Sequence, residues 1–243
     1  MLAVARPRLA RRLAAFAVAG CATAAAAGGP SSPPILVPDT LAQRVQPCAA
    51  CHGKEGRATD HGFYPRIAGK PAGYLYNQLD NFRAGRRSNS TMTYFVEQMS
   101  DDYLREIAGY FAALDLPYAP PQTIGAPPAE LALGEAMVRR GDPARGIPAC
   151  VQCHGAAMTG VLPAVPGLVG LARGYLVEQF GAWRNGQRKA LAPDCMARIA
   201  TMLSPQDIAA VVTWLSSQPV SGPPASADAL VRPLPMACGS VPQ

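Results

Sequence analysis

The chain carries the pentapeptide CAACH at residues 48–52 and the pentapeptide CVQCH at residues 150–154. Cys-x-x-Cys-His is typical of covalent attachment of a c-type haem, with two thioether bonds and a histidine on the iron. A structural zinc site made of two Cys-x-x-Cys pairs is the alternative, but zinc needs no histidine directly after each pair. The repeated motif therefore favours two haems c. Their thioether residues would be Cys48, Cys51, Cys150 and Cys153, and their first axial ligands His52 and His154.

The similarity between the two parts of the chain extends beyond these motifs. GYLYNQ at residues 73–78 matches GYLVEQ at 174–179, and FRAGR at 82–86 matches WRNGQ at 183–187. A period of about a hundred residues is longer than the repeats of solenoid proteins. The sequence therefore predicts a duplicated small domain with one haem in each copy.

Each copy also offers a methionine as the second axial ligand of its iron. Met92 and Met196 both lie eight residues before a serine that opens an apolar-periodic run. Methionine often fills gaps in apolar cores, but the matched position in both copies favours iron binding by the thioether, which raises the reduction potential relative to two histidines. Met99 and Met202 do not match each other in register, so we assign them to packing.

Cys195 lies next to Met196 and has two possible roles. A thiolate on the iron would lower its reduction potential and would indicate a sulfur-chemistry enzyme. In an oxidising compartment, a disulfide with Cys238 is the alternative that we prefer, because it would tie the C-terminal tail to the loop that carries Met196. His61 has no counterpart in the second copy, and we expect it on an exposed loop.

The N-terminal 27 residues predict an export signal. Four arginines are followed by an alanine-rich apolar segment at residues 13–27 that is too short for a convincing membrane span. The tetrapeptide VAGC at residues 18–21 is typical of lipoprotein processing before Cys21, and a lipid there would anchor the protein to a membrane. An ordinary cleavage site around residues 25–27 is equally compatible. Both alternatives place the protein in the bacterial periplasm, soluble or lipid-anchored.

The positive charge of the chain comes mostly from this signal segment. Of the 22 lysines and arginines four precede residue 21, which leaves 18 basic against 16 acidic residues, a net charge of +2. Nucleic-acid binding needs a concentrated basic face. We therefore expect no nucleic-acid partner.

The expected secondary structure is helical throughout. Short helices are predicted at 39–49 and 130–140, middle helices at 72–84 and 173–185, and last helices after Ser100 and Ser204, which are good N-caps. No stretch alternates like a strand. The predicted segments are a signal peptide at 1–27, a linker at 28–37, a first domain at 38–116, a Pro-rich connector at 117–128, a second domain at 129–220 and a tail at 221–243.

Over residues 38–220 these motifs resemble class I cytochromes c in tandem, and most of all the dihaem periplasmic cytochromes of the c4 type. The resemblance implies an all-α fold in which each domain wraps around one haem. It also implies that the carbonyl groups of Pro65 and Pro166 orient the axial histidines. Arg83 and Arg184 would bind haem propionates or, alternatively, remain solvated surface residues.

The same resemblance implies electron transfer rather than catalysis, because an iron bound by His and Met has no open position for a substrate. Electrons would pass from a quinol-oxidising complex or a dehydrogenase to a terminal oxidase. The alternatives are a haem enzyme, such as a thiosulfate dehydrogenase with Cys195 on the iron or a dihaem peroxidase, and the cytochrome subunit of a larger dehydrogenase.

Overall fold

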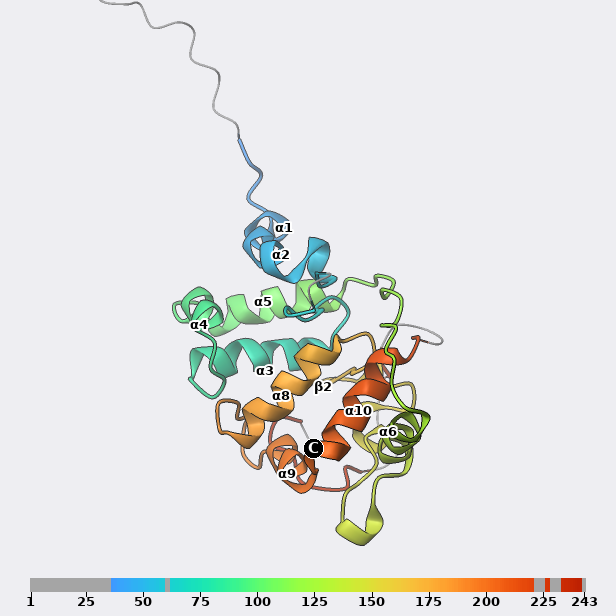
Figure 1. Ribbon diagram of the computed structural model, residues 1–243. Helices are drawn as coiled ribbons and strands as arrows, with labels where there is room; N and C mark the ends of the chain where they lie inside the picture. The colour runs from blue at the N-terminus through green and yellow to red at the C-terminus, as the bar shows by residue number, and fades with distance from the viewer. Residues whose placement is uncertain (1–35, 60–61, 221–225, 228–232, 242–243) are drawn as a thin grey trace, which may run out of the picture. The chain divides into compact units, whose positions relative to one another are not determined.

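The computed structural model describes residues 36–59, 62–220, 226–227 and 233–241 (Figure 1). The predictions about the signal segment, Cys21 and His61 fall outside these residues.

The first half of the described chain consists of helices α1 to α5. They are α1 (Leu41–Arg44), α2 (Gln46–His52), the short 3₁₀ helix η1 (Lys54–Gly56), α3 (Ala72–Arg83), α4 (Ser90–Val96) and α5 (Asp101–Ala112). Helices α3 and α5 pack against each other (Figure 1). Their buried side chains include Leu75 and Phe82 from α3 and Leu104, Ile107 and Phe111 from α5.

The second half repeats this arrangement with a longer segment between its middle helix and its methionine helix. Its elements are α6 (Pro128–Arg140), the 3₁₀ helix η2 (Pro143–Arg145), α7 (Val151–His154), β1 (Gly160–Val161), β2 (Val165–Pro166), α8 (Arg173–Arg184), α9 (Cys195–Met202) and α10 (Pro205–Ser217). Helix α10 packs against α6 and α8. Gly134 allows the closest approach of α6 and α10, because a Cβ atom there would lie 2.2 Å from the carbonyl oxygen of Ala210.

The helix starts follow from local chemistry. The Ser100 hydroxyl accepts a hydrogen bond from the Tyr103 amide, and Ser204 forms a capping box with Asp207, as both N-cap predictions require. The expectation of no strand is wrong in one detail, since β1 and β2 pair antiparallel with Val161 opposite Val165. Two residues per strand are too few for alternation to be visible in the sequence, and the fold is otherwise helical.

The two halves meet through matched backbone segments. The Ser88 amide donates to the Gln187 carbonyl over 2.9 Å, and the Lys189 amide donates to the Arg86 carbonyl over 2.6 Å. These bonds flank an antiparallel bridge between Arg87 and Arg188. Equivalent residues of the two repeats thus lie side by side. Within the described part of the chain, no helix is both long and apolar enough to span a bilayer.

Candidate functional site

One mainly apolar cavity of about 570 Å³ is lined by both halves of the molecule. Its apolar walls include Leu75 and Phe82 from the first half and Leu176 and Phe180 from the second. Of the predicted attachment and axial residues, the lining includes Cys48, Cys51, His52, Met92, Cys153, His154 and Met196. Except for Cys150, which is not part of the lining, each half therefore directs its predicted haem residues into a shared apolar space, the kind of environment in which cofactors are bound.

The four attachment cysteines carry free thiols and are half-buried. In the described ranges, His, Cys, Asp and Glu side chains do not gather in groups of three or more that could hold a metal ion. The zinc alternative requires cysteines arranged around one point, and the cysteines are thus not placed for such a site.

Both histidines predicted as axial ligands are oriented by a proline carbonyl. His52 Nδ1 lies 2.9 Å from the Pro65 oxygen, and His154 Nδ1 lies 2.7 Å from the Pro166 oxygen. Because a carbonyl can only accept, Nδ1 carries the proton in each ring and Nε2 keeps its lone pair for a metal. Burial lowers the pKa of both imidazoles, which favours the neutral form that binds iron.

The two methionines predicted as iron ligands lie on short helices that the sequence did not predict. Met92 is in α4, where its amide donates to the Asn89 side chain over 3.0 Å. Met196 is in α9, where the Asp194 carboxylate accepts from the Ala197 amide over 2.9 Å. Both helices begin with a side-chain N-cap, Asn89 three residues before Met92 and Asp194 two residues before Met196. Met99 and Met202 pack into the apolar clusters, although Met99 also reaches the cavity wall.

Cys195 and Cys238 form a disulfide, with their Cα atoms 5.0 Å apart. A sulfur in a disulfide is not a thiolate, so this arrangement is incompatible with Cys195 as an iron ligand. Cys238 is buried.

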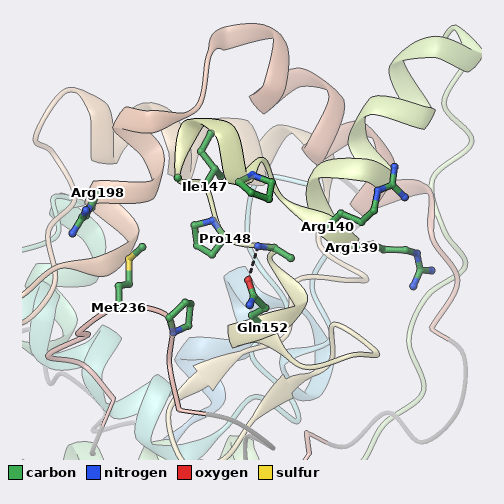
Figure 2. A pocket seen from close by; sticks show the side chains of 11 residues that line it. Arg139, Arg140, Ile147, Pro148, Gln152, Arg198 and Met236 are labelled. Carbon is green, nitrogen blue, oxygen red and sulfur yellow. Dashed lines mark hydrogen bonds between the residues drawn. The ribbon is translucent and has the colours of Figure 1, made fainter.

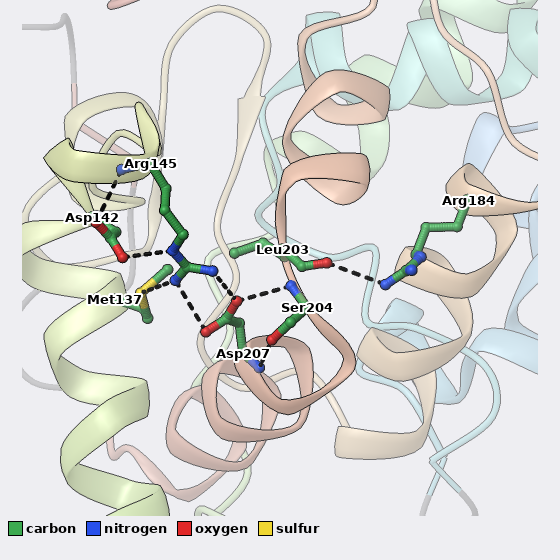
Figure 3. Close-up of polar contacts among 7 residues, drawn as sticks. All are labelled: Met137, Asp142, Arg145, Arg184, Leu203, Ser204 and Asp207. Carbon is green, nitrogen blue, oxygen red and sulfur yellow. Dashed lines mark hydrogen bonds and ion pairs between the residues drawn. The ribbon is translucent and has the colours of Figure 1, made fainter.

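Arg83 and Arg184, for which the resemblance implied contacts with haem propionates or a solvated surface position, do not line the cavity. Arg83 donates to the Met99 carbonyl over 2.8 Å and pairs with Asp80 and Asp101. Arg184 donates to the Leu203 carbonyl over 3.2 Å (Figure 3). Each guanidinium group therefore fastens the end of its helix to the loop before the next long helix.

A different pair of arginines, Arg87 and Arg188, lies in the cavity wall where the halves meet. The Gln78 side-chain oxygen accepts from both guanidinium groups, each over 3.0 Å. The Gln179 oxygen likewise accepts from Arg87 over 2.8 Å and from Arg188 over 2.6 Å. Arg87 also donates to the Tyr175 hydroxyl over 3.1 Å. The four side chains at matched repeat positions form one polar cluster across the interface.

This cluster places two positive charges together, and the carboxylate that acts on Arg87, that of Glu178, forms no described ion pair with it. Arg188 is 6% exposed, Arg87 is half-buried, and no described ion pair includes either residue. Burial above all, and the charge of Arg87, lower the pKa of Arg188. Burial also acts to lower the pKa of Arg87, but this pKa is raised overall, because the phenol groups of Tyr175 and Tyr74 and the Glu178 carboxylate outweigh burial. Unpaired buried charge is costly. Haem propionates entering this cavity would supply the missing anions, so the residues present fit the cofactor.

The sequence contained a signal for Arg87 and Arg188, but the matched segments of the two repeats ended one residue before them. Arg87 and Arg188 follow directly after the matched segments 82–86 and 183–187. Lys70 gave no such signal, because Leu171 occupies its place in the second copy. Lys70 is 2% exposed and its Nζ donates to the Gly167 carbonyl over 2.9 Å. Burial, with a smaller contribution from Arg66, lowers its pKa to about 7.

Comparison with known proteins identifies similar chains. The family model for cytochrome c matches residues 146–219. The "Thiosulfate dehydrogenase electron acceptor" of Thiomonas intermedia (strain K12) is 38% identical over 183 residues, which cover 75% of this chain and 82% of that protein.

Two solved structures resemble this one. Reduced recombinant cytochrome c4 from Pseudomonas stutzeri superposes with a TM-score of 0.61 and 31% identity, over 72% of this chain and 95% of the other. Thiosulfate dehydrogenase (TsdBA) from Marichromatium purpuratum gives a TM-score of 0.62 and 32% identity over 72% of this chain. The match spans only 37% of that longer protein.

Proposed function

Because the chain belongs to the cytochrome c4 family of c-type cytochromes, we propose that it binds two haems and carries electrons in the bacterial periplasm. Proteins of this family contain haem c and carry electrons. The two haems, their ligands, the compartment and the partners are our proposal.

The observation that carries this proposal is the matched donor set in the two halves. Each half has a histidine whose Nδ1 is held by a proline carbonyl, and a methionine on a separate capped helix of the same cavity. The haem supplies reversible one-electron chemistry at its iron. With His52 and Met92 on one iron, and His154 and Met196 on the other, no position remains for a substrate.

The surrounding residues have supporting roles. Pro65 and Pro166 fix the imidazole rings and increase the basicity of Nε2. Arg87 and Arg188 would pair with propionates, and their position between the halves allows each to act on both haems. The apolar lining limits water at the irons, which favours the reduced state and a higher potential.

We propose a thiosulfate-oxidising dehydrogenase as the electron donor and a terminal oxidase as the final acceptor. The donor is supported by the relative that carries the name of a thiosulfate dehydrogenase electron acceptor. In this proposal the chain is not itself the enzyme, because the Cys195–Cys238 disulfide removes the sulfur ligand on which that alternative depended.

A second candidate function is that of a cytochrome subunit bound to its dehydrogenase. It is supported by the match to one part of the longer thiosulfate dehydrogenase chain. Co-elution of the purified holoprotein with such a dehydrogenase in gel filtration would favour the subunit over the diffusing carrier.

The direct test mixes the oxidised holoprotein with thiosulfate, with and without a purified thiosulfate dehydrogenase. We expect both haems to be reduced only when the dehydrogenase is present, at a rate that rises with its concentration. With ferricyanide as the sole oxidant, the holoprotein alone should consume no thiosulfate. Steady thiosulfate consumption by the holoprotein alone would contradict the carrier and support an enzyme.

A further inference from the structure

The C-terminal residues 233–241, which we call the strap, are fixed to the second half beside Met196. Cys238 is bonded to Cys195, and the Gly239 amide donates to the Pro193 carbonyl over 2.9 Å. The strap backbone touches the neighbouring loop so closely that a Cβ atom at Gly239 would lie 2.1 Å from the Ala192 oxygen. Two anchors of the strap thus lie one and three residues before Met196.

The strap also forms part of the cavity wall and reaches the first half. Its wall residues are Leu234, Met236, Cys238, Ser240 and Val241. The Asn77 side chain of α3 donates to the Ser240 carbonyl over 2.9 Å. The strap therefore runs from the helix of Met196 to a helix of the first repeat.

A second pocket of about 510 Å³ is lined in part by Pro235 and Met236 of the strap (Figure 2). Met236 lies there across from Pro148 and Gln152, next to the loop that carries Cys150. The Gln152 side chain accepts from the Ala149 amide over 2.8 Å and holds this loop in shape. Met236 thus covers the space between the attachment loop and α9.

The corresponding region of the first half differs in sequence and exposure. When Met92 and Met196 are aligned, Thr91 takes the place of Cys195, so no equivalent disulfide can form. Tyr94 takes the place of Arg198 and is 74% exposed, and Phe95 is 42% exposed. The methionine helix of the first repeat therefore presents open aromatic side chains where the second repeat is fastened to the strap.

We propose that the strap closes the second haem site and positions Met196, while the first site stays open to small ligands and partners. The inference rests on the proposed function in one respect, the binding of iron by Met196. A methionine leaves its iron when its helix moves away. The disulfide and the Gly239 bond resist that movement at the start of α9. Helix α4 has its Asn89 cap, and its Thr93 hydroxyl donates to the Phe82 carbonyl over 3.3 Å, but no covalent link holds its start. Displacement of Met196 should therefore be slower than displacement of Met92.

The test measures the rate of imidazole binding to the oxidised holoprotein. Binding is monitored as the loss of the long-wavelength methionine–iron absorption band. We expect two phases of equal amplitude that differ roughly tenfold or more in rate, a difference of about 1.4 kcal/mol in barrier. In the double variant Cys195→Ala/Cys238→Ala the slow phase should accelerate about tenfold, and the fast phase should not change. Thr201→Ala, on the same helix but outside the strap contacts, is the matched control and should leave both phases unchanged.

Two further measurements keep the proposal testable if the double variant folds poorly. Asn77→Ala keeps the disulfide and removes only the bond to Ser240, and should accelerate the slow phase two- to threefold. In the wild-type holoprotein, the Gly239 amide should resist hydrogen exchange. The proposal would be overturned if the Gly239 amide exchanged at the rate of an unstructured peptide. It would also be overturned if the slow phase kept its wild-type rate in both Cys195→Ala/Cys238→Ala and Asn77→Ala.

These outcomes separate the strap from the proposed function. If Met196→Ala leaves the absorption band of both haems intact, Met196 is not a ligand and the proposed ligand set fails. If Met196→Ala removes one band while the strap variants keep wild-type kinetics, only the strap proposal fails.

Discussion

Replacing Asp207 by asparagine should destabilise the second repeat in a pH-dependent way. The Asp207 carboxylate is 5% exposed and accepts two hydrogen bonds from Arg145, over 2.8 and 3.2 Å (Figure 3). It also accepts from the Ser204 amide over 2.8 Å, which closes the capping box of α10. An asparagine at this position would keep the shape of the side chain and remove its charge.

The size of the effect follows from the pKa. Arg145 above all, with help from Ser204, lowers the pKa of Asp207 to about 2, compared with 3.8 for an ordinary aspartate. This difference corresponds to about 2.5 kcal/mol of stability at pH 7. Because the folded-state pKa is the lower one, the stabilisation is complete well above pH 3.8 and is lost as the pH falls through 2. About half of it remains at pH 3.

The assay is urea unfolding of the holoprotein at pH 7 and pH 3, monitored by far-ultraviolet circular dichroism. Asp207→Asn should lower the free energy of unfolding by about 2 kcal/mol at pH 7 and by about half as much at pH 3. The matched control is Asp102→Asn, an exposed acid in the first turn of α5, which should change stability by less than about 0.5 kcal/mol. An equal loss at both pH values would refute the assigned role of the charge.

Three further predictions concern charge and covalent structure. Lys70→Met should stabilise the protein at pH 6. The gain in stability should shrink from pH 7 to 10, because in this range the unfolded wild type keeps a proton that the folded wild type has lost. Urea titrations at pH 6 and pH 10 check this. Cys195→Ala/Cys238→Ala removes a link between residues 43 positions apart and should cost up to about 4 kcal/mol in thermal unfolding under non-reducing conditions. Arg87→Leu or Arg188→Leu removes a positive charge that would favour the reduced iron, and should lower the haem potentials by an amount on the order of tens of millivolts in a redox titration. Unchanged potentials would remove the pair from the haem environment.

The features that the sequence predicted well depend on local chemistry. Ser100 and Ser204 mark helix starts because their hydroxyl groups can satisfy free amides of the first turn without any tertiary contact. The segments 72–84 and 173–185 became α3 and α8 within one residue, because glycine follows each helix end.

The features that the sequence did not predict depend on chain direction and tertiary contacts. Arg83 and Arg87 are equally matched in the repeat, but Arg83 is still in α3, where Asp80 one turn earlier binds it. Arg87 follows the turn at Gly85, which carries it into the interface. Lys70 contacts the Gly167 carbonyl of the second half and the Tyr118 ring of the connector, and no single-repeat pattern contains that information.

The sequence did not predict the helices that carry Met92 and Met196, because both are short. With 7 and 8 residues, α4 and α9 are too short for a helical period to be distinct. Their caps, Asn89 and Asp194, were the available signal.

The measurement that tests the central claim most directly is the absorption spectrum of the oxidised holoprotein for wild type, Met92→Ala and Met196→Ala. Two irons with one His and one Met each predict a methionine–iron band that falls by half in each single variant and is absent when both residues are replaced. A band of full strength in either single variant would show that the altered methionine is not an iron ligand, and the carrier account would fail for that half.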